Sequence, residues 1–336
     1  MSTGAIVRGL RSWRHGFTAA ACVLLVAAVA LPRVTLPRDT YSYVVTFDIT
    51  QSMDVEDESL NGEPVSRLAY ARAAMRDALA QLPCGSTVGW GVFTGERTLL
   101  LLAPIEVCGH YDALLASLDA IDGRMRWTNW SRIAEGGVYS AVRVAREIGR
   151  GVAVIFVTDG QEAPPVLPSD ALMRDINPER VGGWLIGVGG DQPAPIPKTD
   201  ANGDRVGYWQ ANDVIQVPTP QGAASPDSHE ERSALRGQYM AAVAGRIGFG
   251  YRRLLTPASL GDAMRDARLA HREPVATDVR AYPALLALLL LVVRFMPELG
   301  KMVFGVQKKE KSTSQQRGGL GETAHYKDKL QCTTKI

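Results

Sequence analysis

The sequence predicts an α/β protein with a doubly wound, mostly parallel β-sheet and one antiparallel edge strand. The run at 43–47 is β-branched and aromatic, and the run at 152–157 is continuously apolar. Runs of this kind indicate strands that are buried on both faces. Segments with apolar residues at helical spacing alternate with them along the chain. Such alternation is typical of sheets whose parallel strands are joined by helical crossovers.

The elements of this fold are assigned in chain order from composition and periodicity. Strands are predicted at 43–47, 87–93, 98–104, 152–157, 183–189 and 251–255, and helices at 67–79, 111–121, 133–148, near Asp170, 234–247 and 259–270. The two strands around the turn at Gly95 form a hairpin, which supplies the antiparallel edge strand. The polar stretch 54–64 is predicted to be an exposed loop.

A hairpin insertion is predicted near 195–218. Its centre, 200–204, carries oxygen-bearing side chains at alternate positions, as calcium loops do, but lacks the Glu at the twelfth place of an EF-hand. Asn202-Gly203 is a preferred two-residue hairpin turn. We therefore expect a structural turn here and not a calcium site.

Both ends of the chain combine apolar segments with basic residues. We expect a basic leader and transmembrane anchor in 1–37, a folded domain in 38–273, a transmembrane helix in 274–300 and a basic, disordered tail in 301–336. The alternatives are a cleaved secretory signal, because 28–30 has small residues at cleavage-like spacing, and a buried core helix at 282–293. The middle of the chain is mildly acidic, which argues against nucleic-acid binding.

Oxygen-bearing side chains follow two of the predicted strands. Asp48, Thr50 and Ser52 place a carboxylate and two hydroxyls at alternate positions where the strand at 43–47 ends. Asp159 directly follows the strand at 152–157, and Thr128 lies in a loop before a helix. The carboxyl ends of parallel strands meet at one edge of a sheet, and oxygen ligands suit Mg²⁺. The alternative for the first segment alone is a turn or a helix cap.

These residues resemble the metal-ion-dependent adhesion site of von Willebrand factor A domains. That family usually shows Asp-x-Ser-x-Ser, so Thr50 departs from the pattern while keeping the hydroxyl. The resemblance implies that the ion, Mg²⁺ with Mn²⁺ or Ca²⁺ as alternatives, is bound by Asp48, Thr50, Ser52, Thr128 and Asp159. It also implies an open coordination position for a partner's acidic side chain. Trp127 and Trp130, which flank Thr128, either pack under a helix or form an apolar rim.

The whole chain resembles bacterial membrane-anchored von Willebrand A proteins that are associated with MoxR-type AAA+ ATPases, of the Bat-like or methanol dehydrogenase accessory type. The Gly187-Val188-Gly189 strand end, the Pro-rich hairpin and the last apolar segment carry this resemblance. It implies a non-enzymatic module in the inner membrane, with a periplasmic domain and cytoplasmic termini. Its role would be the assembly, maturation or metal insertion of a partner enzyme such as methanol dehydrogenase, together with a MoxR-type ATPase.

An enzymatic alternative is a Mg²⁺-dependent phosphohydrolase that uses Asp48 as its nucleophile. Such enzymes also need a positioned Lys and a later acidic pair, for which 158–162 is a poor substitute. None of the five His lies near the polar loops, so the usual general base is missing. The sequence therefore favours a binding module.

Two cysteines bracket the predicted hairpin. Cys84 precedes one strand and Cys108 follows the other, so both should lie at its open end. In an oxidising compartment this spacing predicts a disulfide, and the alternative is two buried free thiols.

Overall fold

The computed structural model describes residues 3–32, 34–166, 168–200, 202–218, 225 and 227–295, without the side chains of 3–14 and 172. The predicted tail at 301–336 lies outside the described residues. The chain divides into two compact units. One is Thr35–Ala276, called the α/β domain below, and the other combines Met1–Val34 with Thr277–Ile336 and is called the helical unit.

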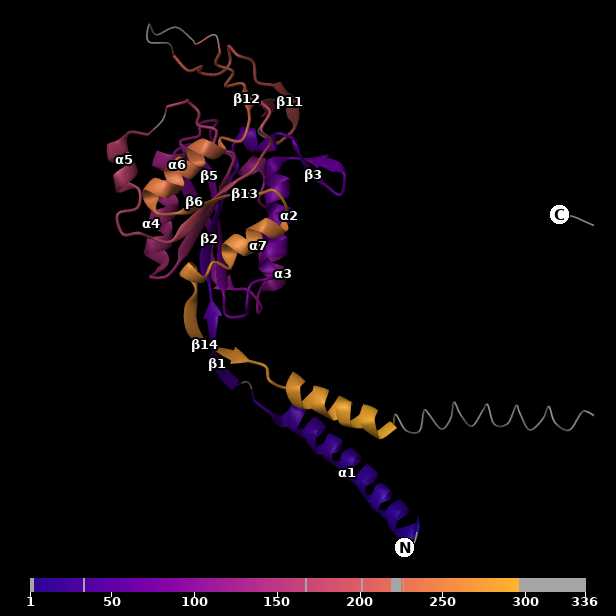
Figure 1. The fold of residues 1–336 in the computed structure, drawn as a ribbon. Coiled ribbons are helices and arrows are strands. Elements are labelled where there is room, and N and C mark those ends of the chain that lie inside the picture. The colour runs from indigo at the N-terminus through magenta and orange to yellow at the C-terminus, as the bar shows by residue number, and fades with distance from the viewer. Residues whose placement is uncertain are drawn as a thin grey trace, which may run out of the picture. The chain divides into compact units, whose positions relative to one another are not determined.

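A six-stranded sheet forms the centre of the α/β domain (Figure 1). Its order is β13-β8-β7-β2-β5-β6, with bounds β2 Ser42–Asp48, β5 Thr87–Thr94, β6 Arg97–Glu106, β7 Ala153–Thr158, β8 Gly183–Gly187 and β13 Gly250–Arg253. Every neighbouring pair is parallel except β5 and β6. The prediction of a mostly parallel sheet with one antiparallel edge strand is confirmed, and this architecture fits a von Willebrand A fold.

Helices cover both faces of the sheet, because the strands are apolar on both sides. In β7, Ala153, Ile155 and Val157 belong to one core cluster, whereas Val154 and Phe156 belong to the other. The first cluster includes α2 Arg67–Leu79, α3 Tyr111–Asp119 and α7 Ala258–Met264, and the second includes α4 Tyr139–Ile148, α5 Asp170–Asp175 and α6 Gly237–Ile247. The sheet is therefore doubly wound, as predicted.

Two predicted helices differ from expectation in their course. The segment 133–148 starts as a π-helix, η3 Ile133–Val138, before α4 begins. A Cβ at Gly137 would lie 2.7–2.8 Å from the rings of Phe156 and Phe93, so glycine lets this turn approach the sheet. The segment 259–270 divides into α7 and a short 3-10 turn, η4 Ala267–Leu269.

Four short strand pairs and two 3-10 turns complete the domain. The pairs are β1 Val34–Thr40 with β14 His271–Thr277, β3 Glu58–Leu60 with β4 Glu63–Val65, β9 Ala194–Pro195 with β12 Arg232–Ser233, and β10 Pro197–Thr199 with β11 Arg205–Tyr208; the turns are η1 Gln51–Asp54 and η2 Gly123–Met125. The prediction that 54–64 is only a loop is wrong. Asn61 and Gly62 both have positive φ, 54° and 87°, which is the geometry of a type I′ hairpin turn.

The insertion hairpin is confirmed as β10 and β11, but its connection is longer than the two-residue turn that was predicted. The carboxylate of Asp200 accepts hydrogen bonds from the backbone N–H groups of Asn202 and Asp204, both at 2.9 Å. The Asp200 carboxylate therefore stabilises a turn through the backbone of Asn202 and Asp204.

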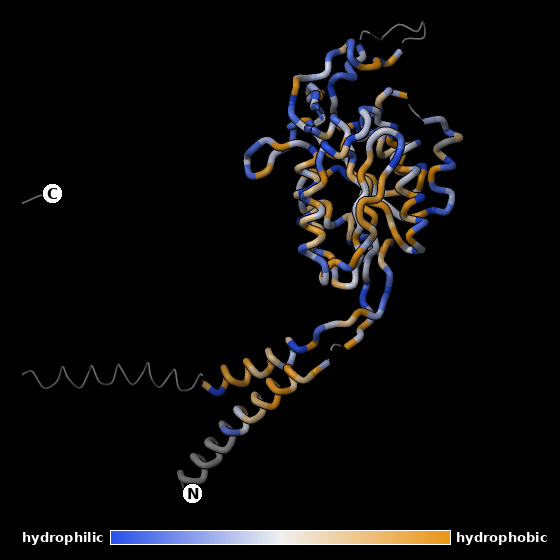
Figure 2. The backbone as a smooth tube through the Cα atoms, turned by 180° about the vertical axis from the view of Figure 1, so that it is seen from behind, coloured by the Kyte–Doolittle hydropathy of each residue, from blue (hydrophilic) through white to orange (hydrophobic). Residues whose placement is uncertain are grey.

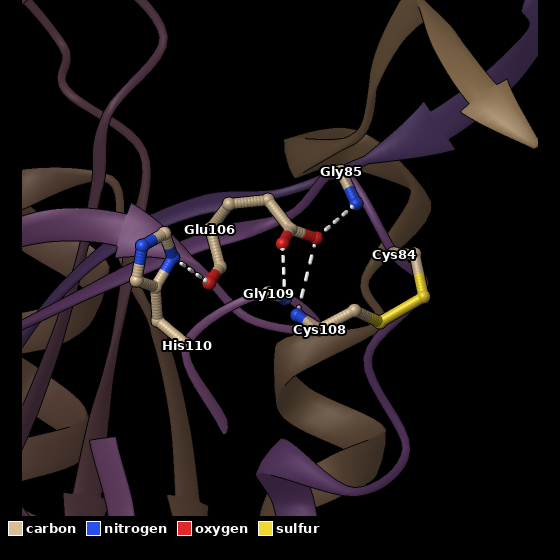
Figure 3. Close-up of a disulfide and its surroundings, with 6 residues drawn as sticks. All are labelled: Cys84, Gly85, Glu106, Cys108, Gly109 and His110. Carbon is tan, nitrogen blue, oxygen red and sulfur yellow. Dashed lines mark hydrogen bonds between the residues drawn. A yellow bond between two sulfur atoms is a disulfide. The ribbon is translucent and has the colours of Figure 1, made fainter. Parts of the chain in front are cut away.

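Cys84 and Cys108 form the predicted disulfide at the open end of the β5–β6 hairpin, with Cα atoms 5.2 Å apart (Figure 3). Next to it, the Glu106 carboxylate accepts hydrogen bonds from the backbone N–H groups of Gly85, Cys108 and Gly109 (Figure 3). Although burial raises the pKa of Glu106, these three donors bring it below its ordinary value. The carboxylate and the disulfide together connect the two chain segments that leave the hairpin.

We expect replacement of both cysteines by Ser to lower the free energy of unfolding by about 3 kcal/mol. The disulfide joins residues separated by 24 positions, and its loss frees that loop in the unfolded chain. Urea unfolding of the full chain measures the difference. Replacing the exposed free thiol Cys22 by Ser is the matched control and should change nothing. Equal stability of the double variant and the wild type would contradict the prediction.

In the helical unit, α1 Thr3–Ala30 lies beside a second helix over 281–295 (Figures 1 and 2). Ala21, Ala28 and Ala287 are buried, and the Arg280 guanidinium donates to the Leu31 carbonyl over 3.0 Å. Both helices also carry large exposed apolar side chains, among them Val23, Val26, Val29, Leu285, Leu288 and Leu289.

The transmembrane helices that were predicted within 1–37 and 274–300 are not supported. Across the described part of the chain, every helix falls short of the combination of length and apolarity that a membrane span requires. The apolar stretch of α1 lies between His15 and Pro32, and the second helix contains Arg294 near its last described residue. Each apolar stretch is therefore short.

Candidate metal centre

The predicted ligands gather at the carboxyl edge of the sheet, as their positions in the sequence indicate. Asp48 is the last residue of β2, and Thr50 directly precedes η1, which contains Ser52. Asp159 follows β7, the parallel neighbour of β2, in a register that pairs Phe47 with Val157. Asp48, Thr50, Ser52 and Asp159 are all 5% exposed or less. The structure therefore brings these four residues into one buried polar cluster.

Hydroxyl groups surround the carboxylate of Asp48. The Thr50 hydroxyl and the Thr50 backbone N–H both donate to Asp48 Oδ1, at 2.7 and 2.9 Å. Thr158 donates to Asp48 Oδ2 at 2.6 Å, and the hydroxyls of Thr50 and Ser52 lie 3.1 Å apart. The side chains of this set offer only oxygen atoms as metal ligands, and oxygen is the ligand type that Mg²⁺ prefers. Asp48, Thr50 and Ser52 therefore fit a hard divalent ion.

Thr128 lies on the neighbouring loop and is half-buried. Its hydroxyl accepts from the backbone N–H of Trp130 at 3.3 Å, and its carbonyl accepts from the Thr94 hydroxyl at 2.8 Å. A Cβ at Gly95 would lie 2.5 Å from the Thr128 methyl, so that glycine makes room for the threonine. Among the described residues, no hydrogen bond joins Thr128 to the other four predicted ligands.

Asp159 is held by a buried arginine that the sequence did not identify. Arg67, the first residue of α2, has no exposed surface and donates to Asp159 Oδ2 at 2.7 Å. It also binds both carboxylate oxygens of Asp57 at 2.9 and 2.6 Å, and Ser233 donates to Asp159 Oδ2 at 2.8 Å. The other carboxylate oxygen of Asp159 accepts from the Gln161 backbone N–H at 2.9 Å. Asp159 is therefore oriented from several sides.

Burial raises the pKa of Asp48 to about 7, and the negative charge of the nearby Asp159 carboxylate contributes to the same shift. The hydrogen bonds from Thr158 and Thr50 act in the opposite direction and favour the charged form. A divalent ion would relieve the repulsion between the two carboxylates. The two buried carboxylates are therefore a pair whose charge a divalent cation would compensate.

One further residue of the site could have been found from the sequence, and two could not. Thr158 directly precedes Asp159, and a parallel register that places Phe47 beside Val157 also places Asp48 beside Thr158. Ser233 gave no signal, because it lies 74 positions after Asp159 in the short strand β12. Arg67 had a local signal for a helix start only, since Ser66 caps α2 by accepting from Ala69 N.

A cavity of about 360 Å³ opens beside this cluster and is bordered by Thr50 and Ser52. Trp130 lines it and is 54% exposed, and Trp127 on the same loop is 47% exposed. Of the two alternatives for these tryptophans, packing under a helix is therefore wrong, and Trp130 lies at an apolar rim.

The sequence matches no protein-family model and no curated protein. Several solved structures are similar in fold. An aerotolerance-related membrane protein from Bacteroides fragilis is 18% identical, with a TM-score of 0.47 over 67% of this chain and 96% of that one. BatB from Bacteroides thetaiotaomicron, a conserved hypothetical protein, is 18% identical, with a TM-score of 0.47 over 68% and 98%. A von Willebrand factor type A protein from Catenulispora acidiphila is 11% identical, with a TM-score of 0.36 over 77% and 46%. Identities and TM-scores this low show a likeness in fold alone.

Proposed function

We propose that this chain is a metal-ion-dependent protein-binding module. The observation that carries the proposal is the buried Asp48 carboxylate, which is surrounded by hydroxyls at the carboxyl edge of the sheet and lies beside an open cavity. Asp48, Thr50 and Ser52 would hold Mg²⁺, or Mn²⁺ or Ca²⁺ in its place, with Asp159 and Thr128 beside them. The bound ion would supply an electrostatic anchor for the carboxylate of a partner protein.

The balance of charge supports an acidic partner. Without an ion, the ionised carboxylates of Asp48 and Asp159 would repel an incoming acid, although Arg67 offsets part of their charge. A divalent cation neutralises the pair, so the acid then meets no net repulsion.

The setting that we propose for this module is the bacterial inner membrane. The domain would lie in the periplasm and the termini in the cytoplasm, and the helical unit, with its exposed valines and leucines, would provide the membrane contact. There it would assist the assembly, maturation or metal insertion of a partner enzyme such as methanol dehydrogenase, together with a MoxR-type ATPase.

The phosphohydrolase alternative has less support. Its nucleophile would be Asp48, and the hydrogen-bond partners of this carboxylate are the Thr50 and Thr158 hydroxyls and the Thr50 backbone N–H. Among the described contacts of Asp48 there is no lysine or histidine that could position a phosphate or move a proton.

We expect the full chain to bind Mn²⁺ at one site, measured by the electron paramagnetic resonance signal of the free ion. Ser52→Ala and Thr50→Val should each weaken binding about tenfold or more, because each removes an oxygen from the cluster. Ser59→Ala, which changes an exposed hydroxyl on β3, is the matched control and should bind as wild type does.

The same preparations test the enzymatic alternative. Hydrolysis of para-nitrophenyl phosphate in Mg²⁺ should stay at the rate of a blank without protein. A Mg²⁺-dependent turnover that Asp48→Asn abolishes would overturn the proposal in favour of the phosphohydrolase. Equal Mn²⁺ affinity in wild type, Ser52→Ala and Thr50→Val would show that these hydroxyls only cap and turn the chain.

A further inference from the structure

The cavity beside the candidate metal centre has one wall that is built by the insertion between β8 and α6. This wall contains Ile196, Trp209 and Ile215, and it faces Thr50, Ser52 and Trp130. Ile215 is 63% exposed and Trp130 is 54% exposed, so both present large apolar surfaces to an incoming molecule. An apolar pocket therefore adjoins the residues that would hold the ion.

Gln51, which lies between Thr50 and Ser52, connects this wall to the metal loop. Its amide oxygen accepts from the indole N–H of Trp209, and its amide nitrogen donates to the side chain of Asn129 at 3.2 Å and to the Thr199 carbonyl at 3.4 Å. A second connection comes from Arg126, which donates to the Ile49 carbonyl at 2.7 Å and to the Thr199 hydroxyl at 2.9 Å. The pocket wall and the metal loop are thus held in one hydrogen-bonded arrangement.

The charges around the pocket select against a second acidic group. Three carboxylates line it, and each already has partners: Asp213 with Lys198 at 3.4 Å, Glu230 with Gln161 at 2.6 Å and Arg236 at 3.2 Å, and Glu162 with Tyr239 at 2.6 Å. Among the described residues that line the pocket there is no lysine or arginine. A carboxylate entering it would therefore find no cation in the lining to pair with, whereas an apolar side chain would meet Trp and Ile surfaces.

We propose that this pocket receives a bulky apolar side chain of the partner segment whose acidic residue binds the ion. The inference rests on the proposed function and adds the partner's sequence pattern to it. In an extended segment, side chains two positions apart lie on the same face and are separated by about 6.6–6.8 Å. Because Thr50 and Ser52 themselves line the pocket, both side chains of the partner must leave the same face of its segment, so we place the aliphatic or aromatic residue two positions from the Asp or Glu.

Selection from a display library of short random peptides with one fixed Asp tests this pattern. The full chain is immobilised in Mg²⁺, and bound peptides are eluted first with EDTA and then with acid, which releases any peptide that EDTA leaves bound. We expect the eluted peptides to be enriched about tenfold or more in Leu, Ile, Phe or Trp two positions from the fixed Asp, which is the order of discrimination that an apolar pocket provides.

Two variants test whether the wall of the pocket causes this preference for apolar residues. Ile215→Asp places a carboxylate in the wall at a position that is already exposed, so the fold should tolerate it, and the enrichment should fall to the level of the unselected library. Val206→Asp is the matched control, because Val206 is 61% exposed on β11 and does not line the pocket. It should select the same peptides as wild type.

The outcomes separate the pocket from the metal-dependent function. EDTA-eluted peptides that show no preferred residue two positions from the fixed Asp would contradict the role of the pocket and leave the proposed function standing. The same holds if Ile215→Asp leaves the preference intact. Peptides that require Ile215 but are not released by EDTA would keep the pocket and overturn the metal dependence. Failure to enrich any peptide would overturn both.

Discussion

Replacing Arg67 by Ala should lower the free energy of unfolding by about 3–5 kcal/mol, which is the usual cost of removing one partner from a buried ion pair. The guanidinium is fully buried and binds Asp159, Asp57 and the Ser233 side chain and carbonyl. Its loss leaves Asp159, which has no exposed surface, without a counter-charge. Arg67→Lys should recover only part of this stability, because one ammonium group cannot replace a planar fork that serves two carboxylates.

Urea unfolding of the full chain in EDTA measures this difference without any contribution from a bound ion. The matched control is Arg76→Ala on the same helix, since the ion pair of Arg76 with Asp119 is about half exposed. Exposed pairs contribute roughly 0–1 kcal/mol, so this variant should remain close to wild type. If both variants lost the same small amount, Arg67 would not be the residue that holds Asp159 in place.

The sheet could be predicted from the sequence because its signal is local. The continuous apolar run at 152–157 can be buried on both faces only in the centre of a sheet, and it became β7. The position of Asp48 and Asp159 followed from the same reasoning, since each directly follows a central strand. A carboxylate at the end of a central parallel strand lies at the carboxyl edge of the sheet.

The buried contacts around the site could not be predicted, because their signals are spread over the chain. Arg67 contacts residues 10, 92 and 166 positions away, and its own neighbours in sequence predict only an Ala-rich helix. The wall of the pocket depends on Trp209 reaching Gln51 across 158 positions. The contacts of Ser233 and Trp209 form only when the insertion folds against the carboxyl edge, so no periodicity or local motif indicates them.

The last prediction concerns Asp48→Asn, which should make the ion-free protein less sensitive to pH while abolishing its response to Mg²⁺. The pKa of Asp48 is raised from its ordinary 3.8 to about 7. A carboxyl group with a raised pKa stabilises the fold fully below its unfolded pKa, and that contribution is lost as the pH rises through the folded pKa. In EDTA, the wild-type melting temperature should therefore fall between pH 5 and pH 8 by more than that of the variant, which lacks this titration.

Magnesium should stabilise the wild type and not the variant, because the ion binds the ionised carboxylate. At pH 8 and a Mg²⁺ concentration about 100 times its Kd, binding should stabilise the wild type by about 2.7 kcal/mol and leave Asp48→Asn unchanged. Glu58→Gln is the control, since burial also raises the pKa of Glu58 but this residue binds the backbone of Gly189 and none of the predicted ligands. It should keep the full response to Mg²⁺, measured by the shift in melting temperature. A Mg²⁺ response that survives in Asp48→Asn would place the ion elsewhere, and the raised pKa of Asp48 would then have no role in binding it.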